Sequence, residues 1–459
     1  MYKNLYFIGI GGIGMSALAR YFNQRGVVIY GYDKTETELT RQLELEGMSI
    51  HYEDRPDLIP QALDMVILTP AVPNDLKEYQ TILERNIPYL KRSQVLGQIT
   101  AGNKNIAVAG THGKTTTSCL LAHLIYCANI PMTAFLGGIA VNYQSNYLDT
   151  GDDWMVEEAD EYDRSFLQLS PDLAVIGSLD PDHLDIYGTH EAMIETYLEF
   201  ARKIKPNGLL LLSDTIPKQV QDQFRNQLQS LRIKTYGIGQ SDLRFEVIGT
   251  DSGWMLFNYI RNNYNMSNLR LRMPGNHNLR NAVAAITLAE ELGISQESIR
   301  LSLENFKGIK RRFEWIEESN RRVLIDDYAH HPEELRAAIE ACRSIYPGRN
   351  ITGIFQPHLY SRTRDFLHEF AHVLSQLDQV ILVELYPARE PAILGISSET
   401  IYNLLTVDSK YLTTKKQLPE LLRTLQLDVV MTLGAGDLDM MQNEIKHAIF
   451  EKAAITNLL

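Results

Sequence analysis

Short apolar runs that suit buried strands alternate along the chain with longer stretches of helical periodicity. Clear strand candidates are residues 5–9, 65–69, 106–109, 173–178 and 351–355. Strands that alternate with amphipathic helices are typical of parallel, doubly wound sheets. The pattern therefore predicts an α/β protein.

A glycine turn at residues 110–113 follows the strand expected at 106–109 and leads into an apolar helix. Backbone N–H groups in such a turn bind phosphate, while Lys114 can reach the β and γ phosphates and the Thr115 hydroxyl can hold Mg²⁺. The full Walker spacing is absent, because Val108 stands five positions before Gly113. An ordinary strand, turn and helix with an exposed lysine is the alternative. We expect His112 to act on the conformation of the loop. The candidate phosphate-binding residues are Gly110, Thr111, His112, Gly113, Lys114, Thr115 and Thr116.

A run of carboxylates follows another apolar strand, which begins near Trp154, and comprises Glu157, Glu158, Asp160 and Glu161. In a nucleotide-binding sheet, such a strand end supplies a magnesium ligand across from the phosphate loop. Neighbouring residues on a strand point to opposite faces, so only one or two of these groups can face the phosphates. The sequence leaves open whether Glu157 or Glu158 does so.

The first strand runs into a second glycine turn. Gly9, Gly11 and Gly14 fit the pattern G-x-G-x-x-G, which brings a diphosphate to a helix N-terminus. Asp33 follows the next strand, about where a ribose hydroxyl lies in a dinucleotide fold. The motif indicates a diphosphate and says nothing about hydride transfer. An NAD-dependent oxidoreductase is the rival enzyme class, but it leaves residues 110–116 unexplained.

Polar clusters also follow the strands expected at residues 322–326 and 429–433. Ligands in open α/β sheets bind at such carboxyl ends. His330 and His331 are adjacent, and Asp327 is near, so a zinc site is one alternative. Adjacent histidines point apart and no third ligand lies at helical spacing, so we favour contacts to a substrate or nucleotide.

The length of 459 residues suits about three domains of roughly 150 residues each, and 44% hydrophobic composition supports their cores. We place a Rossmann-like domain at residues 1–98 and a central phosphate-loop ATPase-type parallel-sheet domain at 99–308. Short β-like runs at 241–275 indicate a small antiparallel part within the central domain. Residues 309–459 form a C-terminal Rossmann-like α/β domain.

Charge and cysteine content narrow the function. The formal net charge of −13 argues against a nucleic-acid surface, which needs clustered Lys and Arg. No apolar run reaches the length of a membrane helix. Cys119, Cys127 and Cys342 form no C-x-x-C pair, so we expect them to be buried in a protein of the reduced cytoplasm.

Seven motifs, in this order, resemble those of the Mur ligases across essentially the whole chain. They are Gly110-Thr-His-Gly-Lys-Thr-Thr, Glu158-Ala-Asp-Glu, Asp182-His-Leu-Asp, Gly275-Asn-His-Asn-x-x-Asn, Arg311-Arg-Phe-Glu, Asp327-Tyr-Ala-His-His-Pro and Gly434-Ala-Gly-Asp. The chain is most similar to the member that joins L-alanine to the lactyl carboxylate of UDP-N-acetylmuramate. The nearest alternative is the member that attaches a whole tripeptide to that sugar nucleotide. A non-catalytic nucleotide switch is a further rival.

The resemblance implies a cytoplasmic, ATP-dependent acid–amino-acid ligase of peptidoglycan precursor synthesis that uses ATP and Mg²⁺. The implied substrates are UDP-N-acetylmuramate and L-alanine, with neither nucleic acid nor membrane as a partner. The carboxylate of the sugar nucleotide would attack the γ-phosphate of ATP, and the amine of alanine would attack the resulting acyl phosphate. The protein would be a monomer or a weak homodimer.

The resemblance also assigns roles to individual residues. The implied catalytic residues are Lys114, His183, Arg312 and His330. The implied metal ligands are Thr115, Glu158 and His183. Residues 110–116 would bind ATP together with His277, Asn278, Asn281, Arg312 and Asp327. Contacts to the UDP-sugar and alanine would come from Gly9, Gly11, Gly12, Gly14, Asp33, Thr69, Ala71, His330, His358, Arg362 and Arg364.

One position departs from the family's pattern. Within residues 356–364, this chain has Leu359 where the commoner form of the segment has arginine. The departure leaves open which side chains of that segment contact the substrate. The sequence also leaves open how strictly alanine is preferred over serine or glycine.

Overall fold

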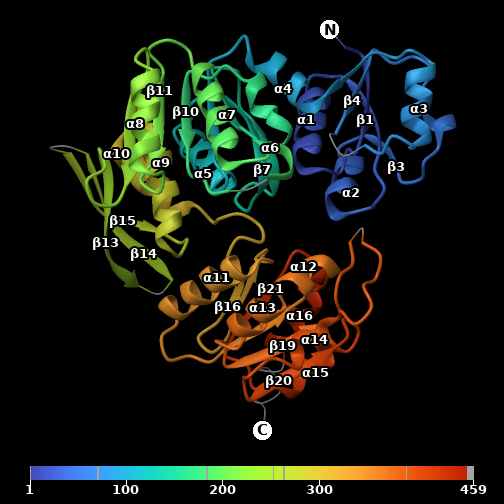
Figure 1. Ribbon diagram of the computed structural model, residues 1–459, viewed down its shortest axis with the longest axis vertical. Helices are drawn as coiled ribbons and strands as arrows, with labels where there is room; N and C mark the ends of the chain where they lie inside the picture. The colour runs from blue at the N-terminus through green and yellow to red at the C-terminus, as the bar shows by residue number, and fades with distance from the viewer. Residues whose placement is uncertain are drawn as a thin grey trace. The chain divides into compact units, whose positions relative to one another are not determined.

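The computed structural model describes residues 2–69, 72–181, 184–251, 253–261, 264–388 and 390–451, with only the backbone of Leu184 and Asp185. These residues form three β sheets with helices packed on them (Figure 1). Residues 1–247, 257–270 and 276–307 form one compact unit, and residues 248–256, 271–275 and 308–459 form another. The predicted α/β class is confirmed.

The N-terminal sheet is parallel, with the strand order β3-β2-β1-β4-β5. Alternate residues of β1 serve opposite faces, because successive side chains on a strand point to opposite sides. Leu5 and Phe7 share a core with α1, whereas Tyr6 shares one with Ile82 of α3. The elements are β1 (Asn4–Ile8), α1 (Ile13–Gln24), β2 (Val28–Tyr32), α2 (Glu38–Leu45), β3 (Ser49–His51), η1 (Pro56–Leu58), β4 (Met65–Leu68), α3 (Lys77–Glu84), β5 (Tyr89–Lys91) and α4 (Arg92–Thr100).

The central sheet has the order β15-β14-β13-β12-β11-β10-β6-β9-β7-β8. Its middle is parallel, and β8 adds an antiparallel edge against β7. At the other edge, three consecutive strands lie side by side where the sequence predicted an antiparallel part. The strands are β6 (Asn105–Ala109), β7 (Met132–Ala140), β8 (Ser145–Asp149), β9 (Trp154–Glu158), β10 (Leu173–Ile176), β11 (Leu209–Ser213), β12 (Arg232–Gly237), β13 (Leu243–Asp251), β14 (Trp254–Arg261) and β15 (Tyr264–Leu271).

Helices cover both faces of the parallel part of this sheet. On one face α5 packs against α9, and on the other α7 shares a core with β10 and β11. The helices are α5 (Lys114–Cys127), η2 (Tyr162–Gln168), α6 (Leu184–Tyr187), α7 (His190–Arg202), α8 (Lys218–Gln227), α9 (Asn276–Glu291) and α10 (Gln296–Asn305).

The C-terminal sheet has the order β16-β17-β21-β18-β19-β20, and β16 is its antiparallel strand. Separate cores on its two faces bury α11, α13 and α14 on one side and α15 and α16 on the other. The strands are β16 (Glu314–Glu318), β17 (Val323–Asp327), β18 (Ile351–Phe355), β19 (Gln379–Val383), β20 (Ser409–Thr413) and β21 (Val429–Leu433). The helices are α11 (Pro332–Ile345), α12 (Tyr360–Asp365), α13 (Leu367–Leu374), α14 (Ser398–Tyr402), α15 (Leu418–Thr424), η3 (Leu438–Met441) and α16 (Gln442–Phe450).

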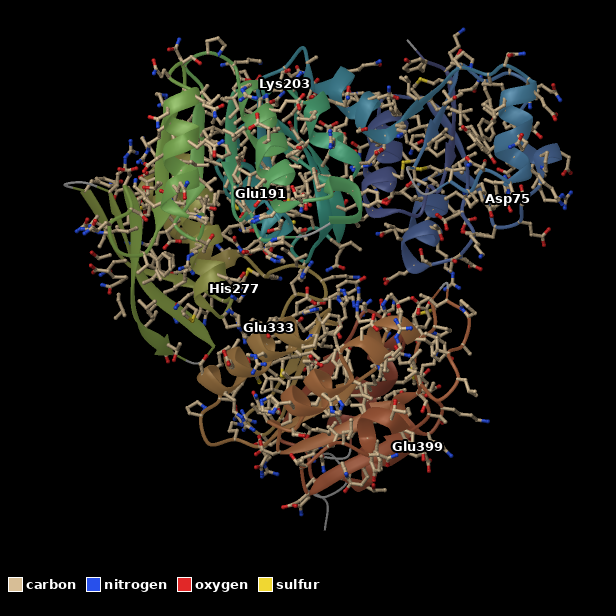
Figure 2. The ribbon with its side chains drawn as sticks, in the orientation of Figure 1. Asp75, Glu191, Lys203, His277, Glu333 and Glu399 are labelled. Atoms are coloured by element: carbon tan, nitrogen blue, oxygen red, sulfur yellow. The ribbon has the colours of Figure 1, made fainter. Side chains whose placement is uncertain are left out.

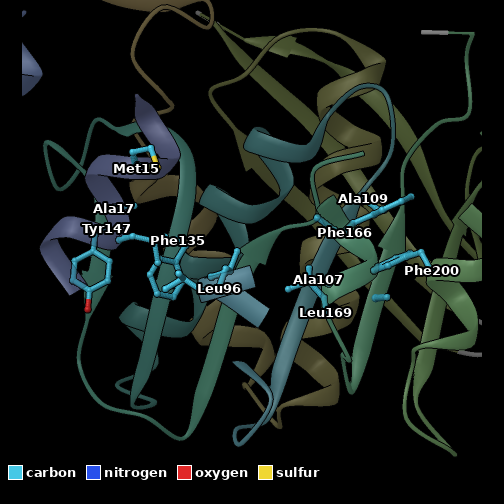
Figure 3. Close-up of a cluster of buried hydrophobic side chains, with 14 of the residues drawn as sticks. Met15, Ala17, Leu96, Ala107, Ala109, Phe135, Tyr147, Phe166, Leu169 and Phe200 are labelled. Carbon is cyan, nitrogen blue, oxygen red and sulfur yellow. The ribbon is translucent and has the colours of Figure 1, made fainter. Parts of the chain in front are cut away.

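One continuous core joins the N-terminal and central sheets. Met15 and Ala17 of α1 belong to the same buried cluster as Phe135 of β7, Tyr147 of β8 and Phe166 of η2 (Figure 3). The two glycine turns therefore sit on sheets that share one apolar interior.

The structure also bears on the predictions about the cysteines and about membrane helices. Cys119 and Cys342 are buried as predicted, but the prediction was wrong for Cys127, which is exposed because it is the last residue of α5. Among the residues that the structure describes, no helix is long and apolar enough to cross a membrane.

Candidate active site

The phosphate loop needs glycine at two positions. Gly110 follows β6 directly and has φ of +126°, and a Cβ atom there would lie 2.8 Å from the backbone nitrogens of Gly177 and Ser178. Gly113 is the N-cap of α5 with φ of +82°, a left-handed conformation that favours glycine. No side chain caps this helix, so its first N–H groups are available to an anion.

Ser178, two residues after the end of the neighbouring strand β10, holds the phosphate loop in place. Its hydroxyl lies 2.7 Å from the Thr111 hydroxyl and accepts a 2.8 Å hydrogen bond from the backbone N–H of His112. Ser178 belongs to none of the sequence motifs described above. Its only signal was its place at a strand end next to Gly177.

Lys114 is folded back into the loop. Its Nζ donates to the Gly110 carbonyl at 2.8 Å and to both carboxylate oxygens of Glu161, at 2.8 and 2.7 Å. The Glu161 side chain is almost fully buried. Of the four candidate carboxylates, Glu161 is therefore the partner of the loop lysine.

Glu158 is the carboxylate that faces α5. It accepts hydrogen bonds from Ser118 Oγ at 3.2 Å, from the N–H of Gly137 at 2.9 Å and from the Thr115 side chain. Burial raises the pKa of this carboxyl, while the nearby positive charge of Lys114 opposes the increase. Thr115 and Glu158 thus present a hydroxyl and a carboxylate together, which are ligands that suit Mg²⁺.

Glu157 lies on the opposite face of β9, where it is fully buried. Burial raises its pKa well above the ordinary value, with the charge of Asp172 adding to the effect. Of the two neighbouring carboxylates, Glu158 and not Glu157 therefore lies beside the phosphate loop. His183, the other implied metal ligand, lies outside the described residues. Within the described ranges, no group of three or more metal-binding side chains occurs.

The start of α9 lies at the phosphate loop. A Cβ atom on Gly113 would be 2.5 Å from Oδ1 of Asn281, so this side chain lies directly over the turn. Asn278 and Asn281 lie inside α9, which begins at Asn276, and both are buried. His277 is exposed in the first turn of α9 (Figure 2).

Helix α9 also carries Arg280, which forms an ion pair that the sequence did not predict. Nε of Arg280 lies 2.7 Å from Oδ1 of Asp214, the residue after β11. This pair ties α9 to the carboxyl end of the sheet, beside the phosphate loop.

The N-terminal glycine turn is also closely packed. A Cβ atom on Gly9 would lie 2.6 Å from Cγ2 of Thr69, so both residues lie together at adjacent strand ends. Asp33 accepts a 2.8 Å hydrogen bond from the N–H of Gly11 and thereby holds the turn. Gly12 is the N-cap of α1, without a side-chain capping bond. Ala71 lies outside the described residues.

In the C-terminal unit, the neighbouring arginines Arg311 and Arg312 have different surroundings. Arg311 donates to the Gly434 carbonyl at 2.6 Å and pairs with Asp439 at 3.0 Å. Arg312 is exposed, with its guanidinium 5.8 Å from the ring centroid of Tyr328. Arg312 is therefore the member of the pair that can meet an external anion.

Asp327 ends β17 and accepts 2.8 Å hydrogen bonds from the N–H groups of Phe313 and Ala329. Burial raises the pKa of its carboxyl to about 6, against the nearby charge of Arg312. This strand end thus offers an acceptor next to the exposed arginine.

The two histidines implied to hold the substrate lie together. The ring centroids of His330 and His358 are 6.1 Å apart, and His358 stacks on Tyr386. Burial lowers the pKa of both, to about 4 for His358, so both rings are neutral at pH 7. His331 lies apart from them, against Phe366.

Arg362 joins this group and Arg364 does not. Nη1 of Arg362 lies 3.5 Å from Nδ1 of His358. Arg364 is exposed and pairs with its neighbour Asp365 at 2.7 Å. Leu359 has φ of +70°, a strained conformation for a branched side chain.

Three domain models of one family match the chain in order. They are the Mur ligase family catalytic domain at residues 4–104, the Mur ligase middle domain at 108–289 and the Mur ligase glutamate ligase domain at 311–436. The chain belongs to the Mur ligase family, as the sequence predicted. Its phosphate loop and strand-end clusters fall within these matched ranges.

Individual relatives are similar over almost their whole length. The chain is 45% identical over 453 residues to UDP-N-acetylmuramate--L-alanine ligase of Cytophaga hutchinsonii, covering 96% of each chain. It is 44% identical over 444 residues to the enzyme of that name from Phocaeicola vulgatus, covering 95% of this chain and 96% of the relative.

A solved structure has the same fold. UDP-N-acetylmuramate-alanine ligase MurC from Thermotoga maritima superimposes with a TM-score of 0.83 at 28% identity, covering 97% of this chain and 99% of that one. A murein peptide ligase from Psychrobacter arcticus gives a TM-score of 0.70 at 22% identity over 97% of this chain and 98% of that one, a likeness of fold alone.

Proposed function

We propose that this protein joins L-alanine to the lactyl carboxylate of UDP-N-acetylmuramate in an ATP-dependent reaction of peptidoglycan precursor synthesis. The observation that carries the proposal is the similarity, at 43–45% identity over nearly the whole chain, to relatives that bear the alanine ligase name. The partly buried Lys114 in a glycine loop supports the use of ATP.

The chemistry requires the carboxylate to be activated. A carboxylate oxygen is a poor leaving group, so the lactyl carboxylate attacks the γ-phosphate of ATP to give an acyl phosphate and ADP. The amine of alanine, once it has lost its proton, attacks the acyl carbon. The tetrahedral intermediate then expels phosphate and leaves an amide. Catalysis of such steps is mostly positioning and charge neutralisation.

In the proposed ATP site, Lys114 leaves Glu161 and reaches the β and γ phosphates, which the uncapped N–H groups at the start of α5 also bind. Residues 110–116 form the cradle, and Asn281 lies close enough to contact the bound nucleotide. Mg²⁺, when bound, would neutralise phosphate charge, and Thr115 and Glu158 would hold it. By similarity to the family, His183 is a further metal or acyl-phosphate ligand.

The remaining roles rest on the family resemblance together with the local geometry. We propose His277 and Asn278 as adenosine contacts, Asp327 as the ribose contact and Arg312 as the γ-phosphate contact. His330, His358 and Arg362 lie in one group, and we propose that they hold alanine. Gly9, Gly11, Gly12, Gly14, Asp33, Thr69 and Ala71 are the proposed contacts for the UDP-sugar.

We also propose that each of the three domains binds one substrate. Residues 1–98 would bind the UDP-sugar, residues 99–308 would bind ATP, and residues 309–459 would bind the amino acid. We also propose that the protein works in the cytoplasm as a monomer or weak homodimer, which sedimentation of the purified protein would test.

Release of phosphate tests the function. The purified protein is given ATP, Mg²⁺ and UDP-N-acetylmuramate with either L-alanine or L-Ala-γ-D-Glu-meso-diaminopimelate, and Lys114→Met serves as the inactive control. We expect release that depends on alanine and is lost in the variant. Release with the tripeptide alone would assign the protein to the tripeptide-adding reaction instead.

A further inference from the structure

Arg92, the first residue of α4, packs against the N-terminal glycine turn. A Cβ atom on Gly14 would lie 2.6 Å from Nη1 of Arg92 and 3.1 Å from its Cδ and Cζ. A side chain at position 14 would therefore displace the guanidinium. The side chain of Arg92 is 19% exposed, so part of the cation reaches the surface beside the first turn of α1.

The other side of the guanidinium pairs with the carboxylate segment of the ATP site. Nη2 of Arg92 lies 3.0 Å from Oδ2 of Asp160, which stands between Glu158 and Glu161. Asp160 is Arg92's only hydrogen-bond partner among the described residues. A guanidinium has five N–H donors in a fixed fork, so most of this fork is available to another acceptor.

The backbone of α4 is held by its close packing on η2. The neighbouring Lys91 is exposed and pairs with Asp163 at 2.9 Å. A Cβ atom on Gly97 would lie 2.7 Å from the carbonyl of Gln168, so α4 lies very close to η2. Because the backbone of α4 is held in this way, Arg92 is a preorganised cation rather than a mobile surface side chain.

The first turn of α1 lies beside Arg92 and has no anion of its own, whereas the preceding glycine turn is held by Asp33. The first turn of α1 has no acidic residue, and its N-cap, Gly12, makes no side-chain capping bond. The turn is instead fixed through its carbonyl side, since the fully buried Asn146 of β8 donates to the Ile13 carbonyl at 2.5 Å and to Ser16 Oγ at 2.9 Å.

We infer that Arg92 binds the diphosphate of the UDP-sugar, together with the N–H groups of the first turn of α1. The inference rests on the proposed function and adds a residue that the sequence motifs did not include. Through Asp160, the same side chain links the sugar-nucleotide site to the carboxylate segment that faces the phosphate loop. The alternative is that Arg92 only holds α4 to η2 through its ion pair.

Variants of the full-length protein separate the two roles. Arg92→Lys keeps the charge and loses the fork, and Arg92→Gln loses both. We expect each to weaken binding of UDP-N-acetylmuramate and of UDP, measured by titration calorimetry, by about ten- to a hundredfold. The KM for ATP should change less than threefold, about the scatter expected of such comparisons.

Two matched variants serve as controls. Asp160→Asn breaks the ion pair and leaves the arginine, so it should change UDP binding far less than Arg92→Gln does. Lys91→Met removes the neighbouring exposed cation and should have little effect. If Asp160→Asn weakened UDP binding as much as Arg92→Gln, or if Arg92→Lys bound UDP as tightly as the wild type, the inference would be overturned.

The binding readout also separates this inference from the proposed function. A wild-type protein that binds UDP but never releases phosphate with alanine or tripeptide would contradict the proposed function and leave the role of Arg92 testable. A wild-type protein with full alanine-dependent activity and Arg92 variants of unchanged UDP affinity would contradict the inference alone.

Discussion

Nζ of Lys114 lies 2.7 and 2.8 Å from the two carboxylate oxygens of Glu161, inside the loop that the lysine is proposed to serve. The two side chains are 17% and 2% exposed. The carboxylate therefore holds the ammonium inside the loop, with only a small part of the lysine side chain exposed. In the proposed ATP site, binding of ATP would exchange one negative partner of Lys114 for another.

The first prediction concerns this pair. Lys114→Met should abolish phosphate release and should also destabilise the fold by about 3–5 kcal/mol, because it removes the ammonium that balances the charge of the buried Glu161 carboxylate. The double variant Lys114→Met/Glu161→Gln should regain most of the stability and none of the activity. Urea unfolding of the three proteins measures this. Equal stability of the single and double variants would show that the pair does not matter to the fold.

The second prediction uses the adjacent carboxylates of β9. Glu158→Gln should raise the Mg²⁺ concentration needed for half-maximal activity at least about tenfold, because it removes a charged oxygen ligand. Glu157→Gln should leave this concentration unchanged, since that side chain is buried on the other face of the strand. Magnesium titrations of phosphate release compare them. A large effect of Glu157→Gln and none of Glu158→Gln would reverse our assignment.

The third prediction concerns stability and pH. Burial raises the pKa of Asp326 from 3.8 to about 6. The folded state therefore favours the protonated acid, and its stability falls as pH rises from about 4 to 6. Asp326→Asn resembles the neutral acid. Relative to wild type, it should gain up to about 3 kcal/mol between pH 4 and pH 7.5. Urea unfolding at both pH values measures this gain, and parallel curves would contradict the shifted pKa.

The fourth prediction contrasts two arginines of α12. Arg362→Ala should raise the KM for alanine about ten- to a hundredfold, because a charge-assisted contact is lost, with little change in the KM for ATP. Arg364→Ala is the matched control, since Arg364 is exposed and pairs with Asp365. Steady-state kinetics of both variants test this. An equally raised alanine KM in both variants would place Arg364 with the proposed alanine-binding group as well, and an unchanged KM in Arg362→Ala would contradict the prediction.

Residues next to glycine turns and strand ends could be predicted from the sequence, because short-range rules position them. Gly110, Gly113 and Lys114 occupy the turn and the helix start that their spacing indicates, and β18 has the predicted bounds. The face of β9 that carries Glu158 could not be read from the sequence. Strand alternation predicts only that the side chains of Glu157 and Glu158 point to opposite faces. It does not predict which of these faces α5 covers.

Contacts between distant segments were the part that the sequence did not reveal. Arg92 meets Asp160 across 68 positions, and Ser178 meets His112 across 66. Arg92 and Ser178 do not belong to any motif with a fixed spacing. The packing of α4 on η2 and of β10 beside β6 brings them to the two turns, and this packing depends on the whole fold.

Isotope transfer tests the central claim most directly. The wild-type protein is given ATP, Mg²⁺, L-alanine and UDP-N-acetylmuramate labelled with ¹⁸O at both lactyl carboxylate oxygens, and the released phosphate is analysed by mass spectrometry. An acyl phosphate intermediate predicts one ¹⁸O atom in each phosphate and one in the amide product. Product formed with unlabelled phosphate would contradict the account, because the carboxylate would then not have attacked the γ-phosphate.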